Sequence, residues 1–129
     1  STVECVVELK RQGQQIVVTH LAASSVDISE VDFTKPSALV LGNEKDGASK
    51  EMIAAADVCV ILPMQGFVQS YNISVAAALC FYHIFRDRWT RQGFHGDLNQ
   101  QQKEILKAHY ALRTLDTSVD ILKKINAET

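Results

Sequence analysis

Three short runs of β-branched and aliphatic residues constrain the fold of this chain more than any other feature. They cover residues 15–21, 38–42 and 58–62, and none of them contains Asp, Glu, Lys or Arg. Continuous apolar runs of this length are typical of strands that are covered on both faces, as in a parallel sheet. Because parallel strands need long crossover connections, usually helices, the pattern predicts an α/β fold with a parallel sheet and flanking helices.

The segments between these runs carry the start and stop signals of helices. Thr2 is placed to cap a first helix that ends near Gly13, and Ser49 is placed to cap a second helix over residues 50–56. Residues 22–37 are polar and are expected to form a loop.

A long third helix is expected after the last apolar run. It should begin near Asn72 and continue past Trp89. Its inner face is expected to carry an apolar stripe of Val75, Leu79, Tyr82 and Phe85.

The C-terminal part predicts a further helix. Asn99, with Gln102 three residues later, resembles a capping box, and the apolar residues that follow favour helix packing. We therefore expect a main domain over residues 1–98 and a helical extension over residues 99–129 that packs on it. Three strands make a thin sheet beside the ~5–6 of an average sheet, so we expect the domain to be N-terminally incomplete.

Composition and charge limit the class of protein. The chain has 129 residues, 47% of them hydrophobic, with a net charge of −2, which indicates a soluble globular domain. Its apolar runs are shorter than the ~18 residues of a membrane span, and residues 1–5 do not resemble a secretory signal, so a cytoplasmic location without membrane contact is expected. The three cysteines and four histidines lack metal-ligand spacing, so we expect no metal and reduced, mostly buried thiols.

Polar motifs follow two of the predicted strands. Residues 41–47 read LGNEKDG, and residues 61–64 (ILPM) are followed by residues 70–76 (SYNISVA). In open α/β folds, ligands bind at the carboxyl ends of the strands, here near His20, Gly42 and Leu62. The first of these motifs is neither a Walker loop nor a dinucleotide fingerprint.

These motifs resemble motifs 2 and 3 of the SpoU/TrmH family of RNA ribose methyltransferases, in the SPOUT superfamily. Residues 16–21 (IVVTHL) and 31–36 (VDFTKP) are also similar to its tRNA branch, and the likeness spans residues 3–94. The resemblance implies an α/β trefoil-knot methyltransferase fold, of which residues 1–98 would be the C-terminal part. It further implies S-adenosylmethionine-dependent methylation of a ribose 2′-hydroxyl of RNA, most often a D-loop guanosine of tRNA.

The resemblance also implies a cofactor pocket. The residues that line this pocket would come from the ends of the three predicted strands and from motif 3. The implied cofactor-binding residues are Thr19, His20, Leu21, Gly42, Ile61, Met64, Ser70 and Tyr71. Tyr71 stands where the family usually has Leu, so its backbone contact is expected to matter more than its side chain.

Catalytic roles are implied for Glu44, Ser70 and Asn72. Glu44 and Asn72 would orient the reacting ribose or a catalytic arginine, and Ser70 would hold phosphate or cofactor. In the family that arginine lies six residues after an Asn in motif 1, which has no match in this chain. We therefore expect the isolated chain to keep the pocket but to transfer methyl groups poorly.

The end of the long helix mixes cations with aromatic residues, which suits contact with RNA. Arg86, Arg88 and Arg91 are the candidate RNA-binding residues. The resemblance also implies a homodimer that uses the motif 3 helix and the C-terminal tail. Three alternatives stay open at this point: a non-catalytic RNA-binding or dimerisation module, an rRNA 2′-O-methyltransferase, and an unrelated flavodoxin-like nucleotide binder.

Overall fold

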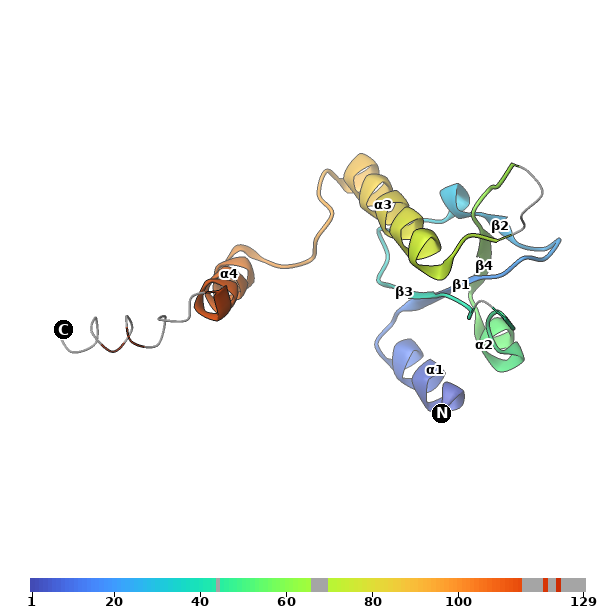
Figure 1. The fold of residues 1–129 in the computed structure, drawn as a ribbon, viewed down its shortest axis with the longest axis horizontal. Helices are drawn as coiled ribbons and strands as arrows, with labels where there is room; N and C mark the ends of the chain where they lie inside the picture. The colour runs from blue at the N-terminus through green and yellow to red at the C-terminus, as the bar shows by residue number, and fades with distance from the viewer. Residues whose placement is uncertain (44, 66–69, 115–119, 121–122, 124–129) are drawn as a thin grey trace. The chain divides into compact units, whose positions relative to one another are not determined.

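The computed structural model describes residues 1–43, 45–65, 70–114, 120 and 123. The chain divides into two compact units, residues 1–95 and residues 96–129 (Figure 1). The second unit contains helix α4 (Gln100–Thr114). Its expected capping box is present, since the Gln102 N–H donates to Asn99 Oδ1 (2.8 Å) and the Asn99 N–H donates to Gln102 Oε1 (2.9 Å).

The first unit is built on a parallel sheet. Strands β1 (Gln15–Thr19), β2 (Val26–Asp27), β3 (Ser37–Val40) and β4 (Val58–Ile61) form a four-stranded sheet within the described residues, in the order β2-β4-β1-β3. Each pairing in it is parallel. The predicted fold class is therefore confirmed, whereas the trefoil knot stays a prediction.

One strand of the sheet was not predicted. The segment expected to be a loop contains β2 and the short 3-10 helix η1 (Ile28–Glu30), which Asp27 caps by accepting a hydrogen bond from the Ser29 N–H (2.8 Å). Strand β2 has two residues and pairs with β4 at Val26 and Val60. A strand of two residues is too short to show a periodic pattern. It is defined by its pairing with a strand more than thirty residues away, which the local sequence does not show.

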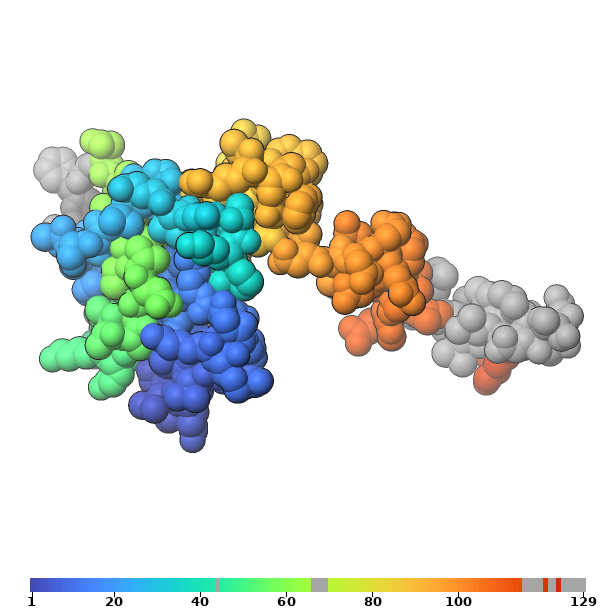
Figure 2. Space-filling view, turned by 180° about the vertical axis from the view of Figure 1, so that it is seen from behind, coloured from blue at the N-terminus to red at the C-terminus, as the bar shows by residue number. Residues whose placement is uncertain are grey.

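Helices cover both faces of the sheet. Figure 1 shows α1 (Thr2–Arg11) and α2 (Lys50–Ala55) together on one side and α3 (Ile73–Gln92) on the other. The space-filling view shows α1 in dark blue against α2 in green (Figure 2). Among these described elements, no helix is long and apolar enough to cross a membrane.

The helix caps largely follow the predictions. Ser49 caps α2 by accepting from the Met52 N–H (3.2 Å), and Asn72 caps α3 by accepting from the Ser74 N–H (2.9 Å). The prediction for α1 was wrong by one residue, because Ser1 and not Thr2 is the cap. The Ser1 hydroxyl accepts from the N–H of Glu4, the acidic residue three positions later that a capping box requires.

The core lies between the sheet and α3. Val17, Phe33, Val60 and Cys80 are fully buried there, and Ile28 and Val31 of the segment after β2 pack beside them. Ile16 and Val18 alternate with Val17 along β1 and are equally buried, so they fill the face covered by α1 and α2. Strand β1 is therefore buried on both faces, as its apolar sequence predicts.

The three cysteines are free thiols, as expected, but they differ in burial. Cys80 is buried, and its burial raises the pKa of its thiol. Cys59 is half-buried and Cys5 is exposed, so the expectation of mostly buried thiols was wrong. Cys5 is exposed because α1 buries none of its side chains fully.

The predicted inner face of α3 was also wrong. Tyr82 is 65% exposed, and Val75, Leu79 and Phe85 are exposed as well. The helix instead turns Cys80, Ile84 and Arg88 toward the core. Apolar residues occur all round this helix, so its sequence does not select one face.

Polar contacts fix the orientation of α3. Asp87 Oδ2 accepts a hydrogen bond from the Phe33 N–H (3.0 Å), and Arg88 Nη1 donates to the Phe33 carbonyl (3.1 Å). Two adjacent side chains thus satisfy both backbone groups of one residue in the segment after η1. These contacts join residues more than fifty positions apart and have no signal in the local sequence.

Candidate functional site

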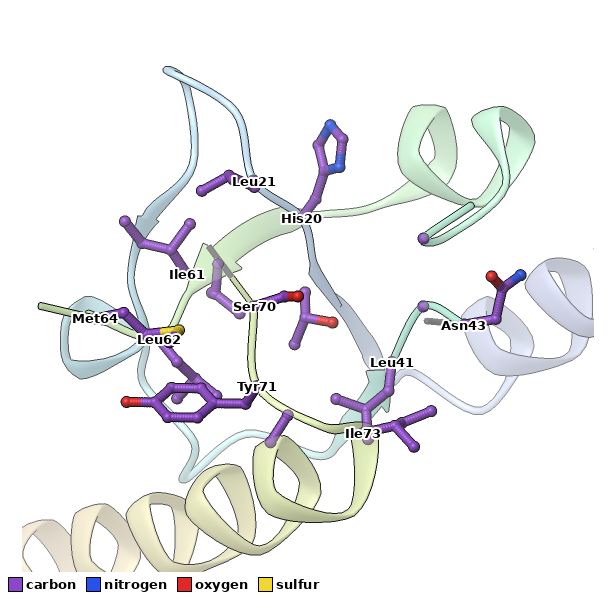
Figure 3. Close-up of a pocket in the computed structure, with 15 residues that line it drawn as sticks. His20, Leu21, Leu41, Asn43, Ile61, Leu62, Met64, Ser70, Tyr71 and Ile73 are labelled. Carbon is purple, nitrogen blue, oxygen red and sulfur yellow. The ribbon is translucent and has the colours of Figure 1, made fainter. Parts of the chain in front are cut away.

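A pocket of about 400 Å³ lies at the carboxyl ends of β1, β3 and β4, where the open α/β rule places a ligand (Figure 3). Four segments line it: the end of β1, the loop after β3, the end of β4, and the start of α3 with the residues just before it. The described lining residues are Thr19, His20, Leu21, Leu41, Gly42, Asn43, Gly47, Val60, Ile61, Leu62, Met64, Ser70, Tyr71, Ile73 and Ala76.

The structure brings the eight predicted cofactor residues together around this one pocket. They are Thr19, His20, Leu21, Gly42, Ile61, Met64, Ser70 and Tyr71. These residues are spread over more than fifty positions of the sequence, and the parallel strands bring them to one edge of the sheet. Their role toward a cofactor stays a prediction.

The end of β1 is held on both sides. Thr19 Oγ1 donates to the Val40 carbonyl (3.3 Å), and the His20 N–H donates to the Val60 carbonyl (3.0 Å). Ser25 Oγ donates to the His20 carbonyl (2.7 Å) and fixes the turn that follows. Since β1 is the central partner of β3 and β4, these bonds give the pocket a rigid floor.

The loop after β3 approaches the pocket as backbone. A Cβ at Gly42 would lie 2.4 Å from the carbonyl carbon of Gly47 and 2.5 Å from the nitrogen of Ala48. Asn43 and Gly47 exchange two backbone hydrogen bonds of 3.1 Å each, and Gly47 has a φ of +72°. Glycine is therefore required at both positions, for space at Gly42 and for conformation at Gly47.

The segment between β4 and α3 forms the opposite wall. Pro63 lies two residues after the end of β4, and Tyr71 Oη donates a long hydrogen bond to its carbonyl (3.4 Å). Figure 3 shows the Tyr71 ring beside Met64, with the Ser70 hydroxyl directed toward the centre of the pocket. Residues 66–69, between Met64 and Ser70 in the sequence, lie outside the described part of the chain.

The three predicted catalytic residues are placed differently. Ser70 lines the pocket. Asn72 does not line it, but caps α3 between two lining residues, Tyr71 and Ile73. Glu44 lies outside the described residues.

The described lining of the pocket combines polar and apolar groups. Asp, Glu, Lys and Arg are absent from its described lining residues, which combine backbone, hydroxyl and amide groups with aliphatic side chains. Such a lining recognises a ligand by shape and by hydrogen bonds rather than by ion pairing. No group of three or more His, Cys, Asp or Glu residues in the described part of the chain could hold a metal ion.

The candidate RNA-binding arginines have unequal access to solvent. Arg86 is exposed, whereas Arg88 is only 8% exposed and donates to the Phe33 carbonyl. Arg91 Nε donates to Asp87 Oδ1 (2.6 Å), and this hydrogen bond raises the pKa of the guanidinium. Arg88 therefore anchors α3 through a tertiary contact that the sequence does not reveal, whereas the hydrogen bond of Arg91 joins two residues of α3.

Seven further lining residues were not among the predicted cofactor-binding residues. Three of them, Leu41, Val60 and Leu62, lie at strand ends, and Leu62 was already predicted to lie near the ligand. Ile73 and Ala76 belong to the first turn of α3, and Asn43 and Gly47 close the loop after β3.

Comparison with known proteins gives a consistent picture. Residues 1–82 match the model of the SpoU rRNA Methylase family. The tRNA (guanosine(18)-2′-O)-methyltransferase of Escherichia coli K12 is 47% identical over 85 residues, which cover 66% of this chain and 37% of that protein. The corresponding protein of Aquifex aeolicus is 41% identical over 105 residues, covering 81% of this chain and 49% of that protein.

Solved structures agree with this match. The TrmH/SpoU tRNA modifying enzyme of A. aeolicus superposes with a TM-score of 0.73 at 35% identity and covers 89% of this chain and 59% of that one. The SpoU methyltransferase AviRb of Streptomyces viridochromogenes, in complex with AdoMet, gives a TM-score of 0.60 at 32% identity, over 68% of this chain and 36% of that one.

The chain spans less than half the length of these two curated relatives. The parallel sheet, the strand-end pocket and both polar motifs lie within the matched residues 1–82. The chain belongs to the SpoU methylase family.

Proposed function

We propose that this chain supplies the S-adenosylmethionine pocket of an enzyme that methylates a ribose 2′-hydroxyl of tRNA, namely the D-loop guanosine. The observation that carries the proposal is the convergence of eight predicted cofactor residues on one pocket. The relatives named as tRNA (guanosine(18)-2′-O)-methyltransferases support the choice of tRNA over rRNA.

The pocket fits a nucleoside-bearing cofactor. Its volume of about 400 Å³ falls within the ~300–1,000 Å³ of typical small-molecule sites. The wall at Gly42 and Gly47 presents backbone without side chains, which allows close approach of a polar ligand edge. The wall at Ile61, Leu62 and Met64 is apolar, which suits a planar base.

The chemistry assigns tasks to residues near this pocket. S-adenosylmethionine, when bound, supplies an electrophilic methyl group on a sulfonium. Ser70 would hold phosphate or cofactor through its hydroxyl, and Glu44 and Asn72 would orient the ribose so that its 2′-oxygen lies in line for attack. The 2′-hydroxyl must also lose its proton, which requires a basic partner.

In the family this partner is the arginine of motif 1. The arginines of this chain are Arg11, Arg86, Arg88, Arg91 and Arg113, and none follows an Asn at the motif 1 spacing. We therefore propose that the isolated chain binds the cofactor and transfers methyl groups poorly.

The exposed face of α3 supports a homodimer. Val75, Tyr82, Phe85 and Trp89 recur along it at spacings of seven, three and four residues, the period of a helix-packing seam. Light scattering at micromolar concentration tests the dimer, and a monomeric mass would contradict it.

We also propose that the protein acts in the cytoplasm.

The proposed function is tested by titrating the 129-residue chain calorimetrically with S-adenosylmethionine, then assaying labelled methyl transfer to unmodified tRNA and rRNA transcripts. Saturable binding with slow, tRNA-selective transfer is expected. RNA binding without cofactor binding would favour the non-catalytic module. Preference for rRNA would identify rRNA instead of tRNA as the substrate. Rapid turnover on tRNA would show that methyl transfer does not require the motif 1 arginine.

A further inference from the structure

The loop after β3 is closed by one side chain. Asn43 Oδ1 accepts hydrogen bonds from two consecutive backbone amides, the Lys45 N–H (2.9 Å) and the Asp46 N–H (2.6 Å). The backbone of Asn43 pairs with Gly47 through two further bonds of 3.1 Å. One residue thus anchors three positions of a loop that lines the pocket.

This closure leaves no spare room at Gly42. Its α-carbon faces the backbone of Gly47 and Ala48 so closely that a Cβ would lie 2.4–2.6 Å from three of their atoms. Gly42, Asn43 and Gly47 all line the pocket. If residues 45–47 shift outward, the wall formed by Gly42 and Gly47 changes shape with them.

The Asn43 side chain is directed away from the ligand space. In Figure 3 its carboxamide lies at the rim and points away from Ser70 and Tyr71. Its oxygen is already engaged by the two amides. The arrangement favours an action through the loop rather than through contact with a ligand.

We propose that Asn43 is a positioning residue for cofactor binding: its side-chain oxygen holds the loop closed and so sets the backbone wall at Gly42 and Gly47. The proposal rests on the proposed function, since it concerns the affinity of the same pocket. The acting atom is the oxygen, because it accepts both backbone hydrogen bonds.

If the side-chain oxygen is the acting atom, two substitutions of Asn43 should differ in their effect on cofactor binding. Asn43→Asp keeps an acceptor for both amides, replaces the side-chain NH₂ by a second oxygen and adds one negative charge. Asn43→Ala loses the acceptor. A direct contact of the NH₂ with the ligand would make both substitutions equally harmful, whereas loop closure makes only alanine harmful.

The test is calorimetric titration of S-adenosylmethionine into the full chain and its variants, with thermal melts in parallel. Asn43→Ala is expected to weaken binding about tenfold, which corresponds to roughly 1.4 kcal/mol, the order of one or two side-chain hydrogen bonds. Asn43→Asp should bind within about twofold of the wild-type chain. Lys45→Ala is the matched control, because it changes the same loop but keeps the backbone N–H that Asn43 binds.

The melting temperature separates positioning from general stability. Unchanged affinity in Asn43→Ala would overturn the proposal, as would equal losses in Asn43→Asp and Asn43→Ala, or losses that merely follow the melting temperature. If Asn43→Ala does not fold, Asn43→Ser, whose hydroxyl accepts such bonds more weakly, should show an intermediate loss, and wild-type affinity would overturn the proposal. Absence of binding by the wild-type chain would overturn the proposed function instead.

Discussion

Backbone crowding leaves no room for a side chain at Gly42 in the pocket wall. The atoms that a Cβ would meet belong to the backbone of Gly47 and Ala48, which cannot rotate away as a side chain does. Gly42→Ala is therefore expected to lower the free energy of unfolding by about 1–3 kcal/mol, and to weaken S-adenosylmethionine binding at least about tenfold. Urea denaturation and calorimetric titration measure the two effects.

Gly96→Ala is the matched control for this change. A Cβ at Gly96 would meet nothing within 4 Å, so the control should leave both quantities unchanged. Equal behaviour of the two variants would contradict the crowding at Gly42.

Alanine substitutions at Arg88 and at Arg86 are expected to have unequal effects on the free energy of unfolding. Arg88→Ala removes a buried donor from the Phe33 carbonyl and should lower the free energy of unfolding by about 1–3 kcal/mol. Arg86→Ala, at an exposed position of the same helix, should change it by less than about 0.5 kcal/mol. If Arg86 contacts RNA phosphate, its loss should reduce the salt slope of RNA binding by about one.

Urea denaturation and filter binding at several salt concentrations distinguish these two roles. A larger stability loss for Arg86→Ala than for Arg88→Ala would contradict the anchoring of α3 by Arg88. An unchanged salt slope would remove Arg86 from the RNA interface.

At the scale of elements, local patterns decided most of what the sequence could predict. The three apolar runs became β1, β3 and β4, and Ser49 and Asn72 cap the helices that were expected to follow them. These features depend on residues close together in the chain. The ends of the strands also follow, and they place the ligand site near His20, Gly42 and Leu62. The eight cofactor residues were named from the family resemblance.

The features that the sequence did not predict depend on contacts between residues far apart in the chain. Strand β2 exists because it pairs with β4, and α3 is oriented by its contacts with Phe33. Arg88 looks like a surface cation in the sequence, and only the packed segment below α3 shows that it is buried. The closure of the loop by Asn43 likewise depends on backbone positions that sequence spacing does not fix.

The segment that carries Phe33 should show an acid-dependent stability. Hydrogen bonds from the Thr34 side chain and backbone lower the pKa of Asp32 below its ordinary value of 3.8. A carboxylate with a lowered folded-state pKa stabilises the fold above the unfolded pKa, and this contribution is lost as pH falls through the folded value. Asp32→Ala should therefore be less stable than the wild-type chain near neutral pH.

The two proteins should become equally stable in acid, below the lowered pKa of Asp32. Urea denaturation at a neutral and an acidic pH measures this difference. Thr34→Ala removes only the hydroxyl donor and should lose less stability at neutral pH than Asp32→Ala. A difference that persists unchanged in acid would contradict the role of the ionised carboxylate.

At the scale of the whole molecule, the pocket and the core come from the first unit. The described lining residues fall between Thr19 and Ala76, and the buried residues fall between Ile16 and Arg88. These residues all belong to the first unit, residues 1–95. The described sheet and the described lining of the pocket are thus built from residues of this unit.

A chain that ends at His95 is accordingly expected to fold and to bind S-adenosylmethionine with the affinity of the full chain, within about twofold. Self-association is the property that should weaken, since the proposed dimer uses the C-terminal tail as well as α3. Circular dichroism, calorimetric titration and light scattering of the shortened and full chains measure the three properties. Lost cofactor affinity with an intact fold would mean that residues 96–129 take part in the pocket, and an unchanged dimer would mean that α3 alone makes the interface.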